Sequence, residues 1–556
     1  MQKGITCITL FIIMSGVLFS QSIFDQSSIS GNLQFDGQYY YKDSVIGAAD
    51  VPDKLLSNGF LFLNYKVSNF SASLRYENYM NPILGIDAQY KGNGIAYRSF
   101  GYSSDFIDVT AGNFYEQFGS GILLRSYEER QLGIDNSFDG LNVKIKPVTG
   151  LEFKALIGKQ RNFWALSEGI VRAADMSISL NDVLGDLFSS DYNISLGGSV
   201  VSKMQPDVES FYYLPHNVFA YSTRLALSAE SFSVDAEFGY KYNDPSAINN
   251  YSFNPGTALV INTALYGDGY GFLLNLHRID NMNFRSEREA AGNNLTINYI
   301  PSITKQHVWR LATLYPYSTQ MNGEVGLQAD FTYTFPKESF FGGKYGTTVA
   351  LNYARIQSLD TTQTVMDQKT GYAFRYDSPF FKVGDRLHYQ DLNLEVTKKW
   401  DKDIKTTFAL INIIYDKDLL EGKSSYGKVN STIAVLECEY KFNPTNSLRT
   451  ELQHLWSTQD SALHAPDNIN GNWALLFLEY TIAPHWYISA FDEWNYGNEY
   501  DEKQIHYLNA SVAYIEKSTR ISFGYGRQRG GLLCIGGVCR EVPASNGFTL
   551  SITSTF

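Results

Sequence analysis

Residues 231–242 read SFSVDAEFGYKY, and this stretch shows the pattern that decides the fold. Apolar and aromatic side chains occupy every second position, and small or charged side chains stand between them. Strict alternation of this kind predicts a β-strand with one apolar and one polar face. A length of about 10–12 residues suits a tilted transmembrane strand, whereas strands of soluble sandwiches are shorter.

The same alternation recurs along the chain, for example in 268–278 and 446–456. Very short turns and longer polar stretches alternate between these segments. Short periplasmic turns and long extracellular loops are typical of outer-membrane barrels. We therefore predict an all-β fold, a single large transmembrane antiparallel β-barrel. The alternative is a soluble exported β-rich protein such as a surface adhesin.

The phase of the alternation gives about 26 strands, an even number as such barrels require, and soft boundaries allow 22–26. These strands run from 31–41 to 546–556 and include 293–300 and 307–316. The last of them ends the chain with an amphipathic face that resembles the signal read by the outer-membrane insertion machinery, an expected partner during biogenesis. This face consists of Phe548, Leu550, Ile552, Ser554 and Phe556.

Composition narrows the class of protein. The 556 residues are 15% aromatic and 18% charged, with a net charge of -12. These values exclude a disordered chain and argue against a nucleic-acid partner, and a mean hydropathy of -0.21 excludes a helical membrane protein. Lys3 and the apolar run after it predict a cleaved signal peptide over 1–20. We expect a short periplasmic segment over 21–30 and a barrel over 31–556 in the bacterial outer membrane.

The segment 112–140 breaks the rhythm, because alternation of short and long connections requires a loop over 119–137. Exposure of Ile122, Leu123 and Leu124 in such a loop would be costly. We hypothesise that 119–137 folds inward and constricts the lumen; the alternative is a strand hairpin that extends above the membrane. The candidate constriction residues are Arg125, Glu128, Glu129, Arg130 and Asp135.

Charges of both signs fall on the polar faces of the predicted strands. They are expected to face the lumen, where they either line a passage or neutralise one another across neighbouring strands. The candidates are Arg75, Glu77, Asp235, Glu237, Glu437, Glu439, Arg449 and Glu451.

Cys534 and Cys539 flank Ile535-Gly536-Gly537-Val538. A two-residue Gly-Gly turn makes the cysteines a directly opposed pair, within reach of a disulfide. We expect this disulfide at the tip of the last outer loop. Arg527, Arg529 and Arg540 around it are candidates to grip an anionic lipid headgroup or a partner, or are solvated loop charges.

Two stretches carry a resemblance: GNFYEQFGSG at 112–121 with Arg125 and Glu128-Glu129-Arg130, and CIGGVCR at 534–540 after Arg529-Gly530-Gly531. They resemble a family of large, functionally uncharacterised bacterial outer-membrane barrel proteins. The resemblance implies location and fold, and transfers no reaction, ligand or catalytic residue.

The functional prediction follows from the barrel. The eight histidines are scattered and form no recognisable catalytic or metal motif, so we expect no enzyme, no cofactor and no metal. We predict a channel-like transport role with the lumen closed or constricted by loops. The alternative is a non-conducting structural subunit of a secretion, assembly or surface-lipoprotein complex. Expected partners are outer-membrane lipids, with surface lipoproteins or other outer-membrane proteins as further candidates.

Overall fold

The computed structural model describes residues 27–185, 191–206, 212–364, 375–460, 468–535 and 538–556. The expected signal peptide over 1–20 lies outside these residues. The first strand begins at Ser27, so the end of the expected periplasmic segment 21–30 already belongs to the barrel wall.

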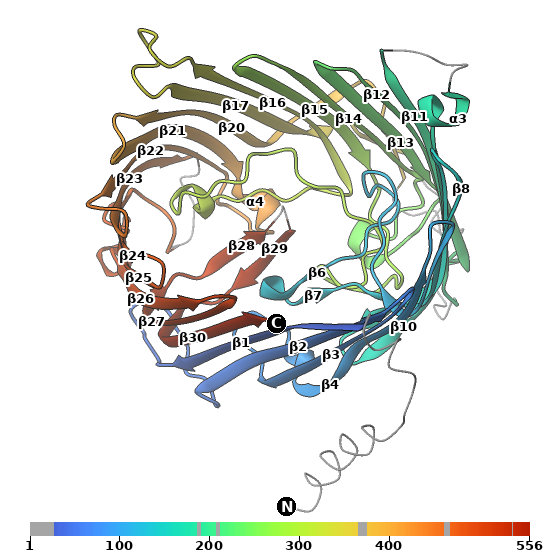
Figure 1. Cartoon of the computed structure of the whole chain (residues 1–556), viewed down its shortest axis with the longest axis horizontal. Helices are drawn as coiled ribbons and strands as arrows, with labels where there is room; N and C mark the ends of the chain where they lie inside the picture. Colours follow the sequence, from blue (N-terminus) through green and yellow to red (C-terminus); the bar gives the residue numbers. More distant parts are fainter. Residues whose placement is uncertain (1–26, 186–190, 207–211, 365–374, 461–467, 536–537) are drawn as a thin grey trace, which may run out of the picture.

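A ring of 24 antiparallel strands forms the wall, in which each strand pairs with the next and the first pairs with the last (Figure 1). The strands of the ring are β1 (Ser27–Tyr40), β2 (Leu55–Val67), β3 (Phe70–Asn81), β4 (Gly92–Ser103), β5 (Ile107–Phe114), β8 (Phe138–Val148), β9 (Leu151–Asn162), β10 (Ala165–Ser179), β11 (Asn193–Met204), β12 (Asn217–Ser228), β13 (Phe232–Lys241), β14 (Gly256–Gly267), β15 (Tyr270–Asp280), β16 (Gly323–Phe335), β17 (Thr347–Leu359), β20 (Val383–Lys399), β21 (Ile404–Asp416), β22 (Lys428–Lys441), β23 (Asn446–Gln459), β24 (Trp473–Ile482), β25 (Trp486–Trp494), β26 (His506–Glu516), β27 (Thr519–Gln528) and β30 (Ser545–Thr555).

The remaining elements are short and lie in the connections. They are β6 (Glu128–Glu129), β7 (Ile134–Asp135), β18 (Thr362–Gln363), β19 (Tyr376–Asp377), β28 (Gly531–Ile535), β29 (Val538–Val542), α3 (Leu180–Leu184), α4 (Lys417–Leu420) and the 3-10 turns η2 (Ala88–Tyr90), η3 (Arg130–Leu132), η5 (Ala247–Asn249), η6 (Ala312–Leu314) and η8 (Asp501–Lys503). No helix among the described residues is long and apolar enough to cross a membrane.

The two rims of the ring differ as the sequence predicts. One rim carries short turns such as 68–69 and 517–518, and β1 begins and β30 ends there. The other rim carries most of the long connections, of which 281–322 is one. We assign the first rim to the periplasm and the second to the outside. Exceptions are the two-residue connection 163–164 on the outer rim and the longer connections 180–192 and 336–346 on the periplasmic rim.

The strand number is 24 rather than 26, within the allowed range, because 293–300 and 307–316 do not join the sheet. Both belong to the long connection between β15 and β16. Ile297, Ile300 and Leu311 in this connection are buried, with 0–2% of each exposed. Short apolar runs do not distinguish a strand from another buried segment, and that ambiguity explains the error.

The two faces of the wall carry the expected chemistry. Large apolar side chains such as Leu351, Leu410 and Leu452 are exposed on the outer face. Aromatic side chains such as Trp486 and Trp494 stand at strand ends. The apolar outer band and the aromatic ends are those of a barrel in an outer membrane.

Leu410 lies at the centre of β21 on this outer face, so Leu410→Arg places a charge in the hydrocarbon. We expect a loss of about 2–4 kcal/mol in the free energy of unfolding, measured by urea titration in liposomes. Gln328→Arg, on the inner face of β16, is the control and should lose far less. Equal losses would contradict the assignment of the faces.

Candidate functional site

Several connections from the outer rim turn into the ring, α4 among them (Figure 1). We call three of them the inward segments: 115–137, 281–322 and 529–544. Figure 1 shows β6 and β7 of the first and β28 and β29 of the third within the circle of strands. Each segment leaves and returns at residues that are paired in the wall. These pairs are Phe114 with Phe138, Asp280 with Gly323, and Gln528 with Ser545.

The apolar part of segment 115–137 packs on the inner face of the wall. Ile122, Leu123 and Leu124 are at most 1% exposed and share a buried core with wall residues of β5, β8–β12, β14 and β15. Ile122 contacts the wall where residue 239 is glycine, and a Cβ there would lie 2.6 Å from Ile122 Cγ2. The backbone N–H of Ser120 donates to Glu237 Oε2 at 2.7 Å. Burial against the wall thus removes the cost of exposing these side chains to water.

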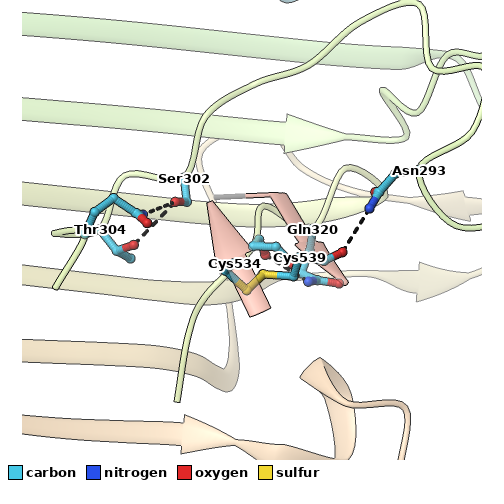
Figure 2. Close-up of a disulfide and its surroundings, with 8 residues drawn as sticks. Asn293, Ser302, Thr304, Gln320, Cys534 and Cys539 are labelled. Atoms are coloured by element: carbon cyan, nitrogen blue, oxygen red, sulfur yellow. Dashed lines mark hydrogen bonds between the residues drawn. A yellow bond between two sulfur atoms is a disulfide. The ribbon is translucent and has the colours of Figure 1, made fainter. Parts of the chain in front are cut away.

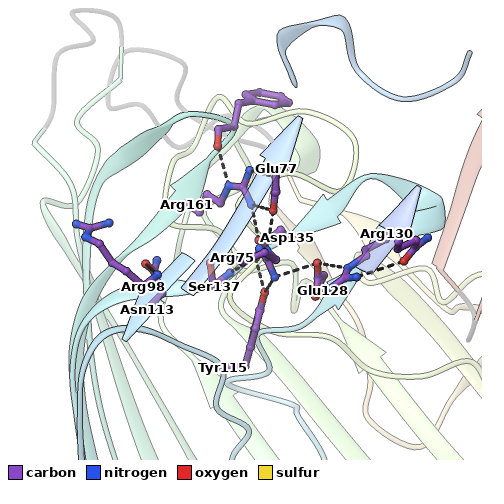
Figure 3. Close-up of polar contacts among 12 residues, drawn as sticks. Arg75, Glu77, Arg98, Asn113, Tyr115, Glu128, Arg130, Asp135, Ser137 and Arg161 are labelled. Carbon is purple, nitrogen blue, oxygen red and sulfur yellow. Dashed lines mark hydrogen bonds and ion pairs between the residues drawn. The ribbon is translucent and has the colours of Figure 1, made fainter. Parts of the chain in front are cut away.

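A cluster of buried ion pairs attaches the same segment to β3 and β9, one on each side of the paired strands β5 and β8 between which the segment leaves the wall (Figure 3). Arg75 on β3 and Arg161 on β9 both bind Asp135 of β7, the second at 2.6 Å. Both arginines also bind Glu77, each at 2.7 Å. Arg75 Nη1 binds Glu128 Oε1 at 2.9 Å. Burial opposes ionisation of Asp135, but the two guanidinium groups lower the pKa of its carboxyl to about 2.

Oxygen atoms of Glu77, Glu128 and Asp135 lie within 4.8 Å of one another, a spacing that a divalent cation could use. Arg75 and Arg161 donate to these carboxylates instead. We therefore assign the group as an ion-pair cluster rather than a metal centre, and it joins two of the predicted lumen-facing residues to two of the predicted constriction residues.

Segment 281–322 runs from the first inward segment to the far wall. Asn298 Nδ2 donates to the carbonyl oxygen of Ile122 at 2.8 Å. At the other end, the N–H of Leu311 donates to Gln453 Oε1 at 2.9 Å. The His307 ring and Asp391 are 2.6 Å apart. The segment is therefore bonded to both sides of the lumen.

The third segment carries the disulfide, and the predicted bridge between Cys534 and Cys539 is confirmed (Figure 2). The hairpin points into the lumen rather than outward. Asn293 Nδ2 of the second segment donates to the carbonyl oxygen of Cys539 at 2.9 Å. Val538 packs with Leu132 and Ile134 of the first segment.

The arginines near the hairpin face protein groups. Arg527 Nε binds Asp43 Oδ2 at 2.8 Å, and Arg529 Nε binds Glu493 Oε2 at 3.2 Å. Arg540 is half-buried and lies near Gly85 and Gly133. These positions do not fit the expectation that the three side chains grip a lipid headgroup.

A cavity of about 500 Å³ lies between segment 281–322, the hairpin and the wall of β20 and β25–β27. Arg310 is its most exposed cation, with 42% of the side chain accessible. The Arg310 guanidinium lies 3.9 Å from the ring centroid of Phe491 and binds Glu493. Other lining residues include Thr304, Lys305, Gln306, His307, Thr313, Asn509, Gln528 and Arg529.

The other predicted site residues are dispersed around the lumen. Arg449 binds Glu437 at 2.5 Å and Glu451 at 2.8 Å, which is the mutual neutralisation considered above. Arg125 lies 4.9 Å from the Tyr299 ring centroid. Two more form ion pairs, Arg130 with Glu128 and Glu439 with Lys441. Glu129 accepts the N–H of Gln131, and Asp235 is exposed.

On the terminal strand, Phe548 and Phe556 are 37% and 63% exposed, while β30 pairs with β1 and β27 and closes the ring. Sequence reasoning missed Lys305, His307 and Arg310, because it placed 293–300 and 307–316 in the wall, with Lys305 between them. The available signal was the loss of regular alternation across 281–322.

A family model described as a family of unknown function (DUF6029) matches residues 1–556. No curated protein matches.

Several solved structures resemble the barrel. The P pilus usher (PapC) translocation pore has a TM-score of 0.40 and 9% identity, covering 95% of this chain and 99% of that one. A BenF-like porin from Pseudomonas fluorescens has a TM-score of 0.36 and 10% identity, covering 78% and 98%. The ferric enterobactin receptor (PfeA) mutant from Pseudomonas aeruginosa has a TM-score of 0.42 and 10% identity, covering 95% and 80%.

The ion-pair cluster makes a stability prediction. Arg75→Met leaves Glu77 and Asp135 buried with one fewer cation, and should lower the free energy of unfolding by about 3–5 kcal/mol. Lys441→Met, which removes an exposed ion pair with Glu439 at the periplasmic end of β22, should cost about 0–1 kcal/mol. The measurement is urea unfolding followed by tryptophan fluorescence. If the two variants lose the same stability, the cluster does not anchor segment 115–137.

Proposed function

We propose that this chain, which belongs to the DUF6029 family of unknown function, conducts small polar solutes across the outer membrane. In this proposal, the inward segments narrow the lumen and set what passes. The barrel catalyses no reaction, and the outer face of β30, with Phe548, Leu550, Ile552 and Phe556, is what the insertion machinery recognises during biogenesis.

The cavity of about 500 Å³ inside the ring is the observation that carries the proposal. Its volume lies within the usual range of small-molecule sites, about 300–1,000 Å³. Its lining combines cations, side-chain amides and hydroxyls with aromatic rings such as Phe491. Such a lining can replace the hydration of a polar solute, which a purely structural core does not need.

Selectivity in this proposal comes from the charges at the narrow part of the lumen. Arg310 and Arg529 share Glu493, so their local sum is one positive charge. On the first inward segment, Arg125, Glu128, Glu129, Arg130 and Asp135 are the proposed constriction residues, and Asp135 and Glu128 hold the segment to Arg75.

A second candidate function is a non-conducting structural subunit of an outer-membrane secretion, assembly or surface-lipoprotein complex. The observation that favours it is the dense packing of the inward segments, which share buried cores with the wall. A barrel whose lumen is permanently filled by such contacts serves as a platform and passes no solute.

Planar-bilayer conductance separates the two candidates. Because Asp280 pairs with Gly323, segment 281–322 can be replaced by an Asn-Gly turn without opening the wall. We expect defined conductance steps from the wild type and larger steps from this deletion variant. Heat-modifiable gel migration is the control for folding. A folded wild type that stays silent under all voltages would favour the structural subunit.

Charge selectivity tests the assigned lining. Arg310→Gln removes one positive charge from the cavity and should shift the reversal potential in a salt gradient toward cation selectivity. Arg98→Gln removes the same charge from a side chain of the outer face and should leave the reversal potential unchanged. A shift of the same size in both variants would refute a passage beside Arg310.

A further inference from the structure

The periplasmic ends of β16, β17, β20 and β21 carry an exposed aromatic and basic patch on the outer face of the barrel. We define the rim patch as Phe335, Phe340, Phe341, Lys398 and Trp400. Phe340 and Phe341 are 93% and 62% exposed, and Trp400 is 56% exposed. Exposed aromatic surface of this extent is typical of a place where the protein contacts a lipid or another protein.

The patch continues the lipid-facing band beyond the ends of the strands. The ring centroids of Tyr333 and Phe335 are 4.9 Å apart, those of Phe335 and Phe341 are 5.3 Å apart, and those of Phe341 and Phe340 are 5.0 Å apart. Phe331, 42% exposed on β16, precedes this row on the membrane side. The rings therefore lead from the hydrocarbon to the level of the lipid headgroups.

Hydrogen bonds within the turn 336–346 fix the patch. Glu338 N–H donates to the carbonyl oxygen of Gly343 at 2.6 Å, and Gly343 N–H donates to that of Ser339 at 2.8 Å. Thr347 Oγ1 donates to the carbonyl oxygen of Phe341 at 2.8 Å. Because the turn is bonded in this way, the exposed rings are held in place before any ligand arrives.

Lys398 brings positive charge to the middle of the patch. Its Nζ lies 4.8 Å from the ring centroid of Trp400 and 3.5 Å from the carbonyl oxygen of Phe341. The Trp400 indole N–H donates to Thr406 Oγ1 at 2.8 Å, which holds the ring against the wall. An ammonium group has three N–H donors, so Lys398 keeps donors that these contacts do not use.

Further lysines stand in the adjoining turns, at 337, 344 and 402. Within the described ranges of the chain, neither these lysines nor Lys398 lie within ion-pair distance of a carboxylate. In the lumen, by contrast, Arg75, Arg161 and Arg449 are each paired with carboxylates. Glu338, Asp401 and Asp403 stand in the same turns as the lysines but outside ion-pair distance of them, so the ammonium groups stay available beside the exposed aromatic rings. Such an arrangement is complementary to an anionic headgroup with acyl chains.

We propose that the rim patch binds an anionic phospholipid of the leaflet that faces the periplasm. The headgroup phosphate accepts hydrogen bonds from Lys398, and Lys337, Lys344 and Lys402 add attraction. The acyl chains lie along Phe331, Phe335 and the neighbouring apolar side chains of the wall. This binding site is independent of the lumen and therefore of the proposed function.

Native mass spectrometry of the detergent-extracted full-length protein tests the proposal. The probes are dioleoyl phosphatidylglycerol and dioleoyl phosphatidylcholine, which differ in headgroup charge and share their acyl chains. We expect the wild type to retain the anionic lipid preferentially. Lys398→Gln should reduce this preference about fivefold, the effect of one basic residue near an anionic surface.

Lys405→Gln is the matched control. Thr406 pairs with Lys398 on the outer face, so its neighbour Lys405 lies at the same rim but on the inner face of β21. It should leave lipid retention unchanged. The double variant Phe340→Ser/Phe341→Ser should lower retention of both lipids. Equal retention of the two lipids by the wild type, or an equal loss in Lys398→Gln and Lys405→Gln, would overturn the proposal. Neither result would change the conductance expected from the proposed function, because the rim patch lies outside the lumen.

Discussion

Closure of 24 strands into one ring is the constraint on which the rest of the structure depends. Barrels of about eight strands can fill their interior with wall side chains, whereas barrels of 22 strands enclose a lumen that needs a plug. Here the chain supplies that material from its own outer connections. Because each inward segment leaves and returns between paired neighbouring strands, the wall stays continuous while the lumen is occupied.

The two faces of the wall meet different environments, lipid outside and the inward segments inside. The outer face presents apolar side chains to lipid. Where the inward segments cover the polar inner face and exclude water, its side chains need hydrogen-bond or ion-pair partners on those segments. Arg75 and Arg161 meet carboxylates of the first segment, and Gln453 and Asp391 meet groups of the second. Ion pairs and hydrogen bonds compensate the polar groups of these covered surfaces and fix the position of each segment.

Much of the wall could be predicted from the sequence, because alternation with period two records which residues face lipid. The pairing of Cys534 with Cys539 could also be predicted, since a Gly-Gly turn determines which residues are opposite. The path of 281–322 could not. Its apolar residues are buried by contacts with distant parts of the chain, and such contacts leave no periodic signal. For the same reason the cavity beside Arg310 was missed.

The hairpin 531–542 connects the interior of the barrel to the strand that closes the ring. It is the last inward segment before β30, and it touches Leu132, Ile134 and Asn293 from both earlier segments. The surface on which the hairpin packs is therefore formed by residues of both earlier segments. The hairpin is also followed directly by β30, the strand that pairs with β1, so the place where the three segments meet and the seam that closes the ring belong to one continuous stretch of chain.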